Sequence, residues 1–89
     1  MEIEVYDTYA TSVKGFKIHF DVMLPIGENE ENASSYAQKF INKIAESTDF
    51  IKLDSCKFCH TEEATTNVSE KVEKDGYCIV PIENCPNPY

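Results

Sequence analysis

The sequence reads Phe16-Lys17-Ile18-His19-Phe20-Asp21-Val22-Met23-Leu24 in the stretch that decides its fold. Apolar and polar side chains alternate there more regularly than anywhere else in the 89 residues. Successive side chains of a β-strand point to opposite faces of a sheet. The pattern therefore predicts a strand whose apolar face consists of Phe16, Ile18, Phe20, Val22 and Leu24. Its other face carries Lys17, His19, Asp21 and Met23.

An earlier strand is predicted over residues 2–7, where the side chains also alternate. Ile3 and Val5 are assigned to its apolar side, and Glu2, Glu4 and Tyr6 to its wet side. Turn-forming residues occupy positions 8–15, so the two strands are expected to be antiparallel neighbours. Ile3 and Val5 are then expected to share one sheet face with Phe16 and the other apolar residues of the 16–24 stretch.

A helix of about four turns is predicted after Pro25-Ile26-Gly27, which ends the preceding strand. Acidic residues at 28–31 suit a helix N-terminus, and Asn29 or Asn32 can act as its cap. Apolar residues at intervals of three and four form a stripe along the helix: Ala33, Tyr36, Ala37, Phe40, Ile41, Ile44 and Ala45. Residues 47–49 break the pattern.

A third strand is predicted over residues 50–53, and it is expected to run into a tight turn at Cys56-Lys57-Phe58-Cys59-His60. After this turn, Thr66 is expected to cap a second helix that continues to Asp75. The inner contacts and the end of this helix are assigned to Val68, Val72 and Gly76. A last strand is expected over residues 77–82, where Pro81 favours a strand end or a sheet edge.

These elements predict an α+β fold with the order β-β-α-β-α-β. We expect two layers, a four-stranded mixed sheet with both helices on one face. Residues 1–83 are expected to form a single domain, because 89 residues leave no room for a second core. Residues 84–89 contain two prolines and are expected to form an exposed C-terminal tail.

The charge balance excludes several kinds of partner. Sixteen acidic residues against eight basic ones give a formal net charge of −8. A nucleic-acid backbone would be repelled, so we expect no nucleic-acid binding. Apolar runs are short, and the N-terminus lacks the pattern of a signal peptide, so we expect no membrane association and a cytoplasmic location.

The cysteines allow three hypotheses. A zinc ion could be held by Cys56, Cys59, Cys85 and His60, although the spacing of a zinc ribbon is incomplete. His19 or Cys78 could stand in for one of these ligands. Alternatively, Cys56 and Cys59 could cycle between dithiol and disulfide as a redox pair. In the third hypothesis the thiols are small structural residues without a ligand.

A polar pair lies on the second strand. His19 and Asp21 are expected on the same sheet face, turned away from the helices. A histidine beside an aspartate can act as an oriented general base, whereas an ordinary polar sheet surface explains the same pair. Together with Tyr6 and Met23, this face could also bind a protein partner or a second copy of the chain.

Several ordered motifs resemble those of a family of short uncharacterised bacterial proteins, a domain of unknown function. The resemblance runs from residue 1 to about Cys85 and rests on residues 1–9, His19-Phe20-Asp21-Val22, the Cys-x-Phe-Cys-His motif at 56–60, Gly76-Tyr77 and Cys85. Cys78 departs from the pattern. The resemblance implies a small α+β domain and brings no established reaction, substrate or cofactor.

The sequence therefore leaves two hypotheses of different classes. The first is a small cytoplasmic interaction or structural module. It could be stabilised by a zinc ion bound to its cysteines, and it could bind an unknown protein partner or a second copy of the chain. The second is a thiol-based redox protein that uses Cys56 and Cys59. No phosphate-binding glycine loop or serine nucleophile motif is present, so we expect a module rather than an enzyme.

Overall fold

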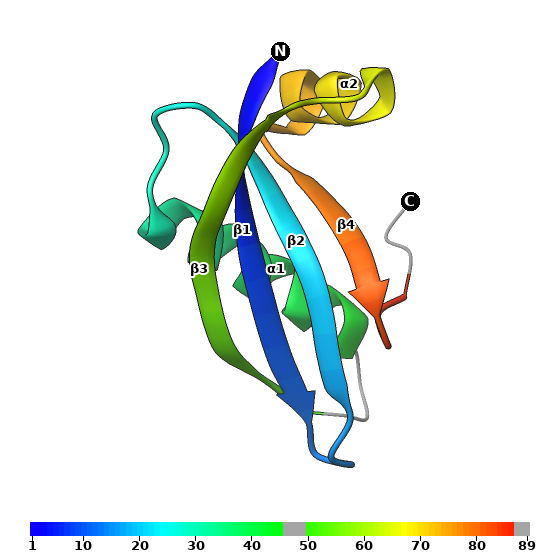
Figure 1. Ribbon diagram of the computed structural model, residues 1–89. Coiled ribbons are helices and arrows are strands. Elements are labelled where there is room, and N and C mark those ends of the chain that lie inside the picture. Colours follow the sequence, from blue (N-terminus) through cyan, green and yellow to red (C-terminus); the bar gives the residue numbers. More distant parts are fainter. Residues whose placement is uncertain (46–49, 87–89) are drawn as a thin grey trace.

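The computed structural model describes residues 1–45 and 50–86. In this part of the chain the elements follow the predicted order β-β-α-β-α-β (Figure 1). They are β1 (Glu2–Ser12), β2 (Lys17–Pro25), α1 (Glu30–Ala45), β3 (Ile51–Glu63), α2 (Thr66–Asp75) and β4 (Cys78–Glu83). The α+β class is therefore confirmed. The break predicted at 47–49 and the last three residues of the predicted tail lie outside the described residues.

The four strands form one sheet in the order β3-β1-β2-β4, and all three pairings are antiparallel. The prediction of a mixed sheet was wrong, because no two neighbouring strands are parallel. The connection through α1 does join two strands of the same direction, β2 and β3, since both run antiparallel to β1. However, β1 lies between them in the sheet, so no parallel pair forms. Pro81 lies in β4, an edge strand, as predicted.

Helix α1 forms as the sequence predicts. Asn29 caps it, because its side-chain oxygen accepts a hydrogen bond from the Asn32 backbone N–H at 2.8 Å. Glu30 and Glu31 occupy the first turn, where the helix dipole favours negative charge. The predicted stripe faces the sheet, and its buried members are Ala33, Ala37, Phe40 and Ile41.

The apolar face of β2 lies beneath α1. Ile18, Phe20, Val22 and Leu24 are all buried there, as predicted. The Phe20 and Phe40 rings meet edge to face with centroids 5.0 Å apart. Phe16 was assigned to this face incorrectly. It precedes β2, and 59% of it is exposed, because the chain is still in the turn that contains Gly15 at φ 86°.

The side of β1 that faces α1 is opposite to the side predicted. Tyr6 pairs with Val22 and faces α1, whereas Val5 pairs with Met23 and faces away. A shift of one residue reverses every side chain of a strand, so Ile3 lies on the far face with Val5. The strand also continues to Ser12 through residues predicted to be a turn. Both of its faces are therefore buried over part of its length.

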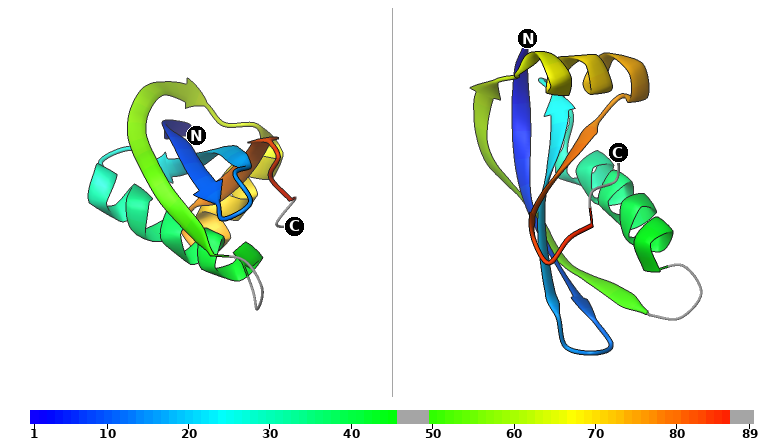
Figure 2. Two further views of the ribbon diagram at one scale, coloured as in Figure 1. Left: turned by 90° about the horizontal axis from the view of Figure 1, so that it is seen from below. Right: turned by 90° about the vertical axis from the view of Figure 1, so that its right-hand side faces the viewer.

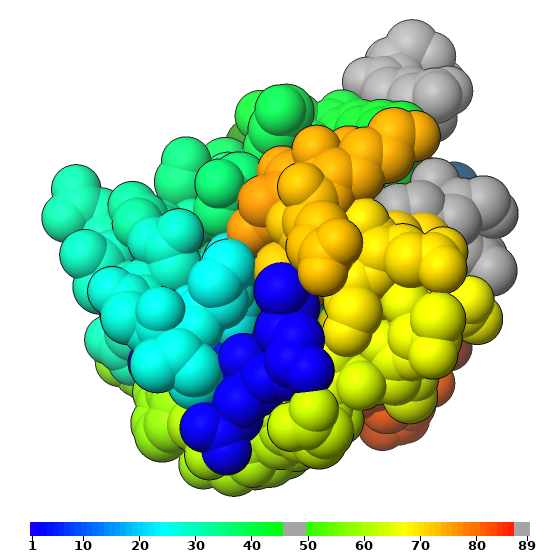
Figure 3. Space-filling view, turned by 90° about the horizontal axis from the view of Figure 1, so that it is seen from above, coloured from blue at the N-terminus to red at the C-terminus, as the bar shows by residue number. Residues whose placement is uncertain are grey.

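Helix α2 does not share a sheet face with α1, contrary to the prediction. It lies across the end of the sheet where β1 begins (Figures 2 and 3). Its buried residue, Val72, packs with Ile3, Val5, Met23 and Cys78, on the face opposite α1. The cap is Thr65 rather than Thr66, and its hydroxyl accepts from the Val68 backbone N–H. Gly76 ends the helix at φ 88°, as predicted.

This arrangement leaves the sheet with two different faces. One packs against α1 over its middle, and the other is covered by α2 only at one end (Figure 2). We call the uncovered remainder of the second face the open face. It is formed by the odd-numbered residues of β1 and β2 from position 7 to 21, with their neighbours on β3 and β4.

Candidate functional site

The Cys-x-x-Cys motif lies within β3 and is not a turn, which corrects the sequence prediction. Cys56 pairs with Thr8, Phe58 with Tyr6 and His60 with Val5, so Cys59 is the extra residue of a β-bulge. Cys56 points toward α1, where the Thr8 hydroxyl donates to its Sγ at 3.3 Å. Phe58 lies on the same face as Cys56, and its ring meets that of Tyr6 edge to face with centroids 5.8 Å apart. Cys59 is exposed.

The fold does not bring the four predicted zinc ligands together within one chain. Cys56 is buried beneath α1, while His60 is exposed and its Nε2 lies 2.7 Å from a Glu62 carboxylate oxygen. Cys85 follows β4, and two strands separate β4 from β3. Three inter-strand spacings amount to about 14 Å, far beyond the reach of one zinc ion. This geometry does not favour a zinc site made of Cys56, Cys59, Cys85 and His60.

Cys56 also lacks the environment of a redox-active thiol. A reactive thiol needs a lowered pKa, usually from a nearby cation or a helix N-terminus. Burial instead raises the pKa of Cys56, although hydrogen bonds from Thr8 and Ser34 oppose this. Burial likewise raises the pKa of Cys85 to about 11. No disulfide joins the four cysteines, all of which lie in the described part of the chain.

Alkylation rates should reveal these environments. At pH 8 we expect iodoacetamide to modify the exposed Cys59 first, and Cys56 and Cys85 at least tenfold more slowly, because only the thiolate reacts and a raised pKa reduces its population. Peptide mass spectrometry over a time course measures each rate. Cys59→Ser should remove the fast phase and leave the others unchanged. Rapid modification of Cys56 in the folded protein would contradict the structure.

A different cluster of chemically active side chains lies on the open face. Asp7 of β1 and Asp21 of β2 are directly opposite each other in the register, and His19 lies two positions from Asp21 on the same face. One ligand atom from each residue lies within 4.8 Å of the others. Among the described residues, no other set of three or more His, Cys, Asp or Glu residues meets that distance. Sequence analysis singled out His19 and Asp21 but not Asp7.

The histidine of this cluster is held on two sides. Its Nε2 is in hydrogen-bonding contact with Asp7 Oδ1. The ring of Tyr9 stacks on the imidazole with centroids 4.2 Å apart and an angle of 11° between the planes. The side chain of His19 is 16% exposed and that of Asp7 36% exposed, so the pair is partly shielded from water. Tyr6, predicted for this face, lies under α1, and Met23 is buried by α2.

Electrostatics at the cluster are dominated by negative charge. Desolvation and the charge of Asp7 raise the pKa of Asp21, and His19 and His60 act in the opposite direction. Desolvation and the charges of Asp7, Glu83 and Asp21 raise the pKa of Tyr9. A site of this kind favours a cation, because the two carboxylates stand side by side and are only partly neutralised by nearby imidazoles.

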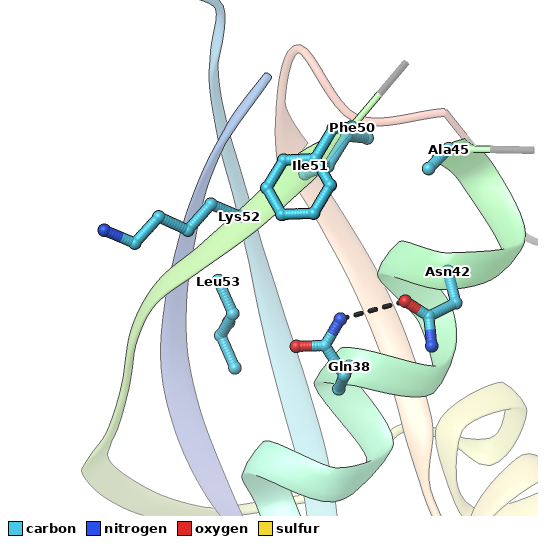
Figure 4. A pocket seen from close by; sticks show the side chains of 7 residues that line it. All are labelled: Gln38, Asn42, Ala45, Phe50, Ile51, Lys52 and Leu53. Atoms are coloured by element: carbon cyan, nitrogen blue, oxygen red, sulfur yellow. Dashed lines mark hydrogen bonds between the residues drawn. The ribbon is translucent and has the colours of Figure 1, made fainter. Parts of the chain in front are cut away.

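A concave region lies elsewhere, between α1 and the start of β3. Its volume is about 370 Å³, and its lining combines amides with apolar side chains: Gln38, Asn42, Ala45, Phe50, Ile51, Lys52 and Leu53 (Figure 4). Gln38 donates a hydrogen bond to Asn42 at 2.9 Å, so these amides already satisfy each other in part. Lys52 is the one charged side chain of this lining. The region therefore has fewer side chains that could bind a charged ligand or a metal ion than the cluster on the open face.

The fold and the site together define a class of protein: a small α+β domain with one helix-covered sheet face and one polar open face. The chain belongs to the family described as domain of unknown function (DUF2024), whose model matches residues 1–82. The NMR structure of protein NE1680 from Nitrosomonas europaea is similar to it, with 34% sequence identity and a TM-score of 0.79. That match covers 97% of this chain and 100% of the other. Among curated proteins, none matches this chain.

In the described residues, no helix is long and apolar enough to cross a membrane.

Proposed function

We propose that this domain is a small binding module that holds a positively charged ligand on the open face of its sheet. The proposal keeps the interaction module favoured by the sequence and replaces its cysteine site with the cluster of Asp7, His19 and Asp21. Binding rather than catalysis fits the position of the cluster on a sheet face. A cytoplasmic location, where the four cysteines remain reduced, is part of this proposal.

The observation that carries the proposal is the cross-strand pair of Asp7 and Asp21. Like charges directly opposite each other destabilise an antiparallel pair by a few tenths of a kcal/mol up to about 1 kcal/mol. Either carboxylate could be replaced by a neutral residue without loss of the strand. A pair that is unfavourable for folding is expected where a bound ligand compensates for it.

The net charge supports the same kind of ligand. At −8 the chain attracts cations and repels nucleic acid. On β3, His60 and Glu62 continue the polar surface beyond the open face, beside Val5 and Ile3, and on β4 Glu83 pairs with His19. The surface around the cluster therefore carries carboxylate and imidazole groups next to Lys57, and its excess of carboxylates suits a small cation or the cationic end of a partner.

An NMR titration tests this proposal. The uniformly ¹⁵N-labelled protein is titrated separately with Zn²⁺, Mg²⁺, spermidine and N-acetyl-arginine amide. We expect at least one of the four to shift the amide signals of Asp7, Tyr9, His19 and Asp21 progressively, because the ligand contacts the strands that carry them. Signals of α1, on the other face, should stay in place.

The matched control for this titration is Glu73→Gln, which removes one negative charge from an exposed position on α2. This variant should bind like the parent, whereas Asp21→Asn should weaken binding at least tenfold. If none of the four cations moves the open-face signals at millimolar concentration, or if Glu73→Gln weakens binding as much as Asp21→Asn, the proposed function is wrong.

A further inference from the structure

We infer that Asp7, His19 and Asp21 form a binding site for a divalent first-row transition-metal ion. This inference rests on the proposed function, since it names the cation that the open face would hold. The three side chains supply two carboxylate oxygens and one imidazole nitrogen, which are established types of metal ligand in proteins. They come from the two central strands of the sheet, so the backbone positions of all three are fixed by the ladder.

The distances suit one ion. Ligand atoms that each lie about 2.1 Å from a metal stand roughly 3 to 4 Å from one another. The three donor atoms of the cluster lie within 4.8 Å of each other, and His19 Nε2 already contacts Asp7 Oδ1. A bound ion would require adjustment of the side chains only, because β1 and β2 already hold the three residues next to one another. A metal would also replace the direct contact between His19 and Asp7, because the ion would take the place of the proton that Nε2 donates to the carboxylate.

The surroundings support the ligands in the way that residues around metal sites do. Tyr9 stacks on the imidazole and restrains its ring plane. His60 lies on the β3 side of the site, and its Nε2 is 2.7 Å from a Glu62 carboxylate oxygen. Lys57 pairs with Asp7 in the register from β3, and its positive charge acts against a bound cation, so the two carboxylates and the imidazole must outweigh it. The site is therefore more than an acidic surface, since it combines an oriented imidazole with two carboxylates.

The donor set distinguishes between metals. Mg²⁺ and Ca²⁺ prefer oxygen donors, whereas imidazole favours Zn²⁺, Fe²⁺, Co²⁺ and Ni²⁺. Two carboxylates and one imidazole therefore favour Zn²⁺ strongly over Mg²⁺. Mn²⁺ is expected to bind at the same place with lower affinity, following the general order of divalent affinities.

Isothermal titration calorimetry tests the site with tag-free protein that has been treated with chelator and then freed of it. We expect one equivalent of Zn²⁺ to bind, Mn²⁺ to bind more weakly, and Mg²⁺ not to bind at equal concentration. His19→Ala and Asp21→Asn should each weaken Zn²⁺ binding at least tenfold, since loss of a ligand costs no less than loss of an outer-shell partner. In the NMR spectrum, bound Mn²⁺ should broaden the signals of residues around positions 7, 19 and 21.

Thermal melting separates binding from folding. Asp21→Asn should melt at or above the temperature of the metal-free parent, because it removes the repulsion with Asp7, yet it should lose the rise in melting temperature that Zn²⁺ gives the parent. Cys59→Ser and Cys85→Ser serve as controls and should keep both Zn²⁺ affinity and the rise. If these cysteine variants lose the ion and Asp21→Asn retains it, the metal site belongs to the thiols and the inference is overturned.

The outcomes also separate this inference from the proposed function. If spermidine or N-acetyl-arginine amide shifts the open-face signals while Zn²⁺ and Mn²⁺ do not bind, the metal inference fails and the binding module stands. If neither organic cations nor metal ions act on the open face, both fail.

Discussion

Val22→Asp is expected to unfold the domain at 25 °C. Val22 is fully buried at the centre of the sheet, between Tyr6 of β1 and Ile79 of β4 and beneath α1. An unpaired carboxylate at this place costs several kcal/mol. A domain of this length has a total stability of about 4 to 13 kcal/mol, so the substitution removes most or all of it. Far-UV circular dichroism and a urea titration measure the loss.

The control lies on the same strand. Lys17 is exposed at the start of β2, so Lys17→Asp adds a carboxylate to the same element without burying it. Its urea midpoint should stay close to that of the parent. A cooperative transition for Val22→Asp at the parent's midpoint would mean that this face of β2 is not in the core.

The face of β2 could be predicted from sequence because only one of its sides is continuously apolar. In β1, by contrast, the sequence does not distinguish a core side from a solvent side. Ile3 and Val5 are buried against α2, while Tyr6 and Ala10 are buried against α1, so both sides of the strand carry core residues. Its alternation identifies a strand, but it does not show which side faces α1. The pairing of Tyr6 with Val22 decides this, and pairing is a tertiary property.

The prediction of a turn at the Cys-x-x-Cys motif was wrong for a different reason. The motif predicts a turn because turns place two thiols together, yet residues 51–63 contain neither glycine nor proline, the residues that favour turns. A strand of 13 residues fits that composition, and a bulge at Cys59 accommodates the change in alternation. The bulge itself has no sequence signature here.

The candidate site was only half visible in the sequence. His19 and Asp21 share a strand, so their common face follows from spacing alone. Asp7 joins them because the β1–β2 hairpin pairs Asp7 with Asp21. The predicted strand at 2–7 includes Asp7, but its alternation places Asp7 with Ile3 and Val5, on the face predicted to lie under the helices. Only the pairing of Tyr6 with Val22 shows that this side of β1 is the face of His19.

Phe40→Ala is expected to cost about 3 to 5 kcal/mol of stability. The Phe40 side chain is 3% exposed and fills the space between α1 and the sheet, where its ring meets that of Phe20. Truncation removes this contact and leaves a cavity that neighbouring β-strands are too rigid to close.

Lys39→Ala is the matched control, because Lys39 is the adjacent residue of α1 and is exposed. It should change the urea midpoint very little, since alanine is a good helix former. Both variants should keep the slope of the unfolding transition if they fold to the same structure. A midpoint for Phe40→Ala equal to that of Lys39→Ala would show that α1 does not anchor the sheet through this residue. The open face lies on the other side of the sheet, so Phe40→Ala should retain the parent's Zn²⁺ affinity under conditions where it remains folded.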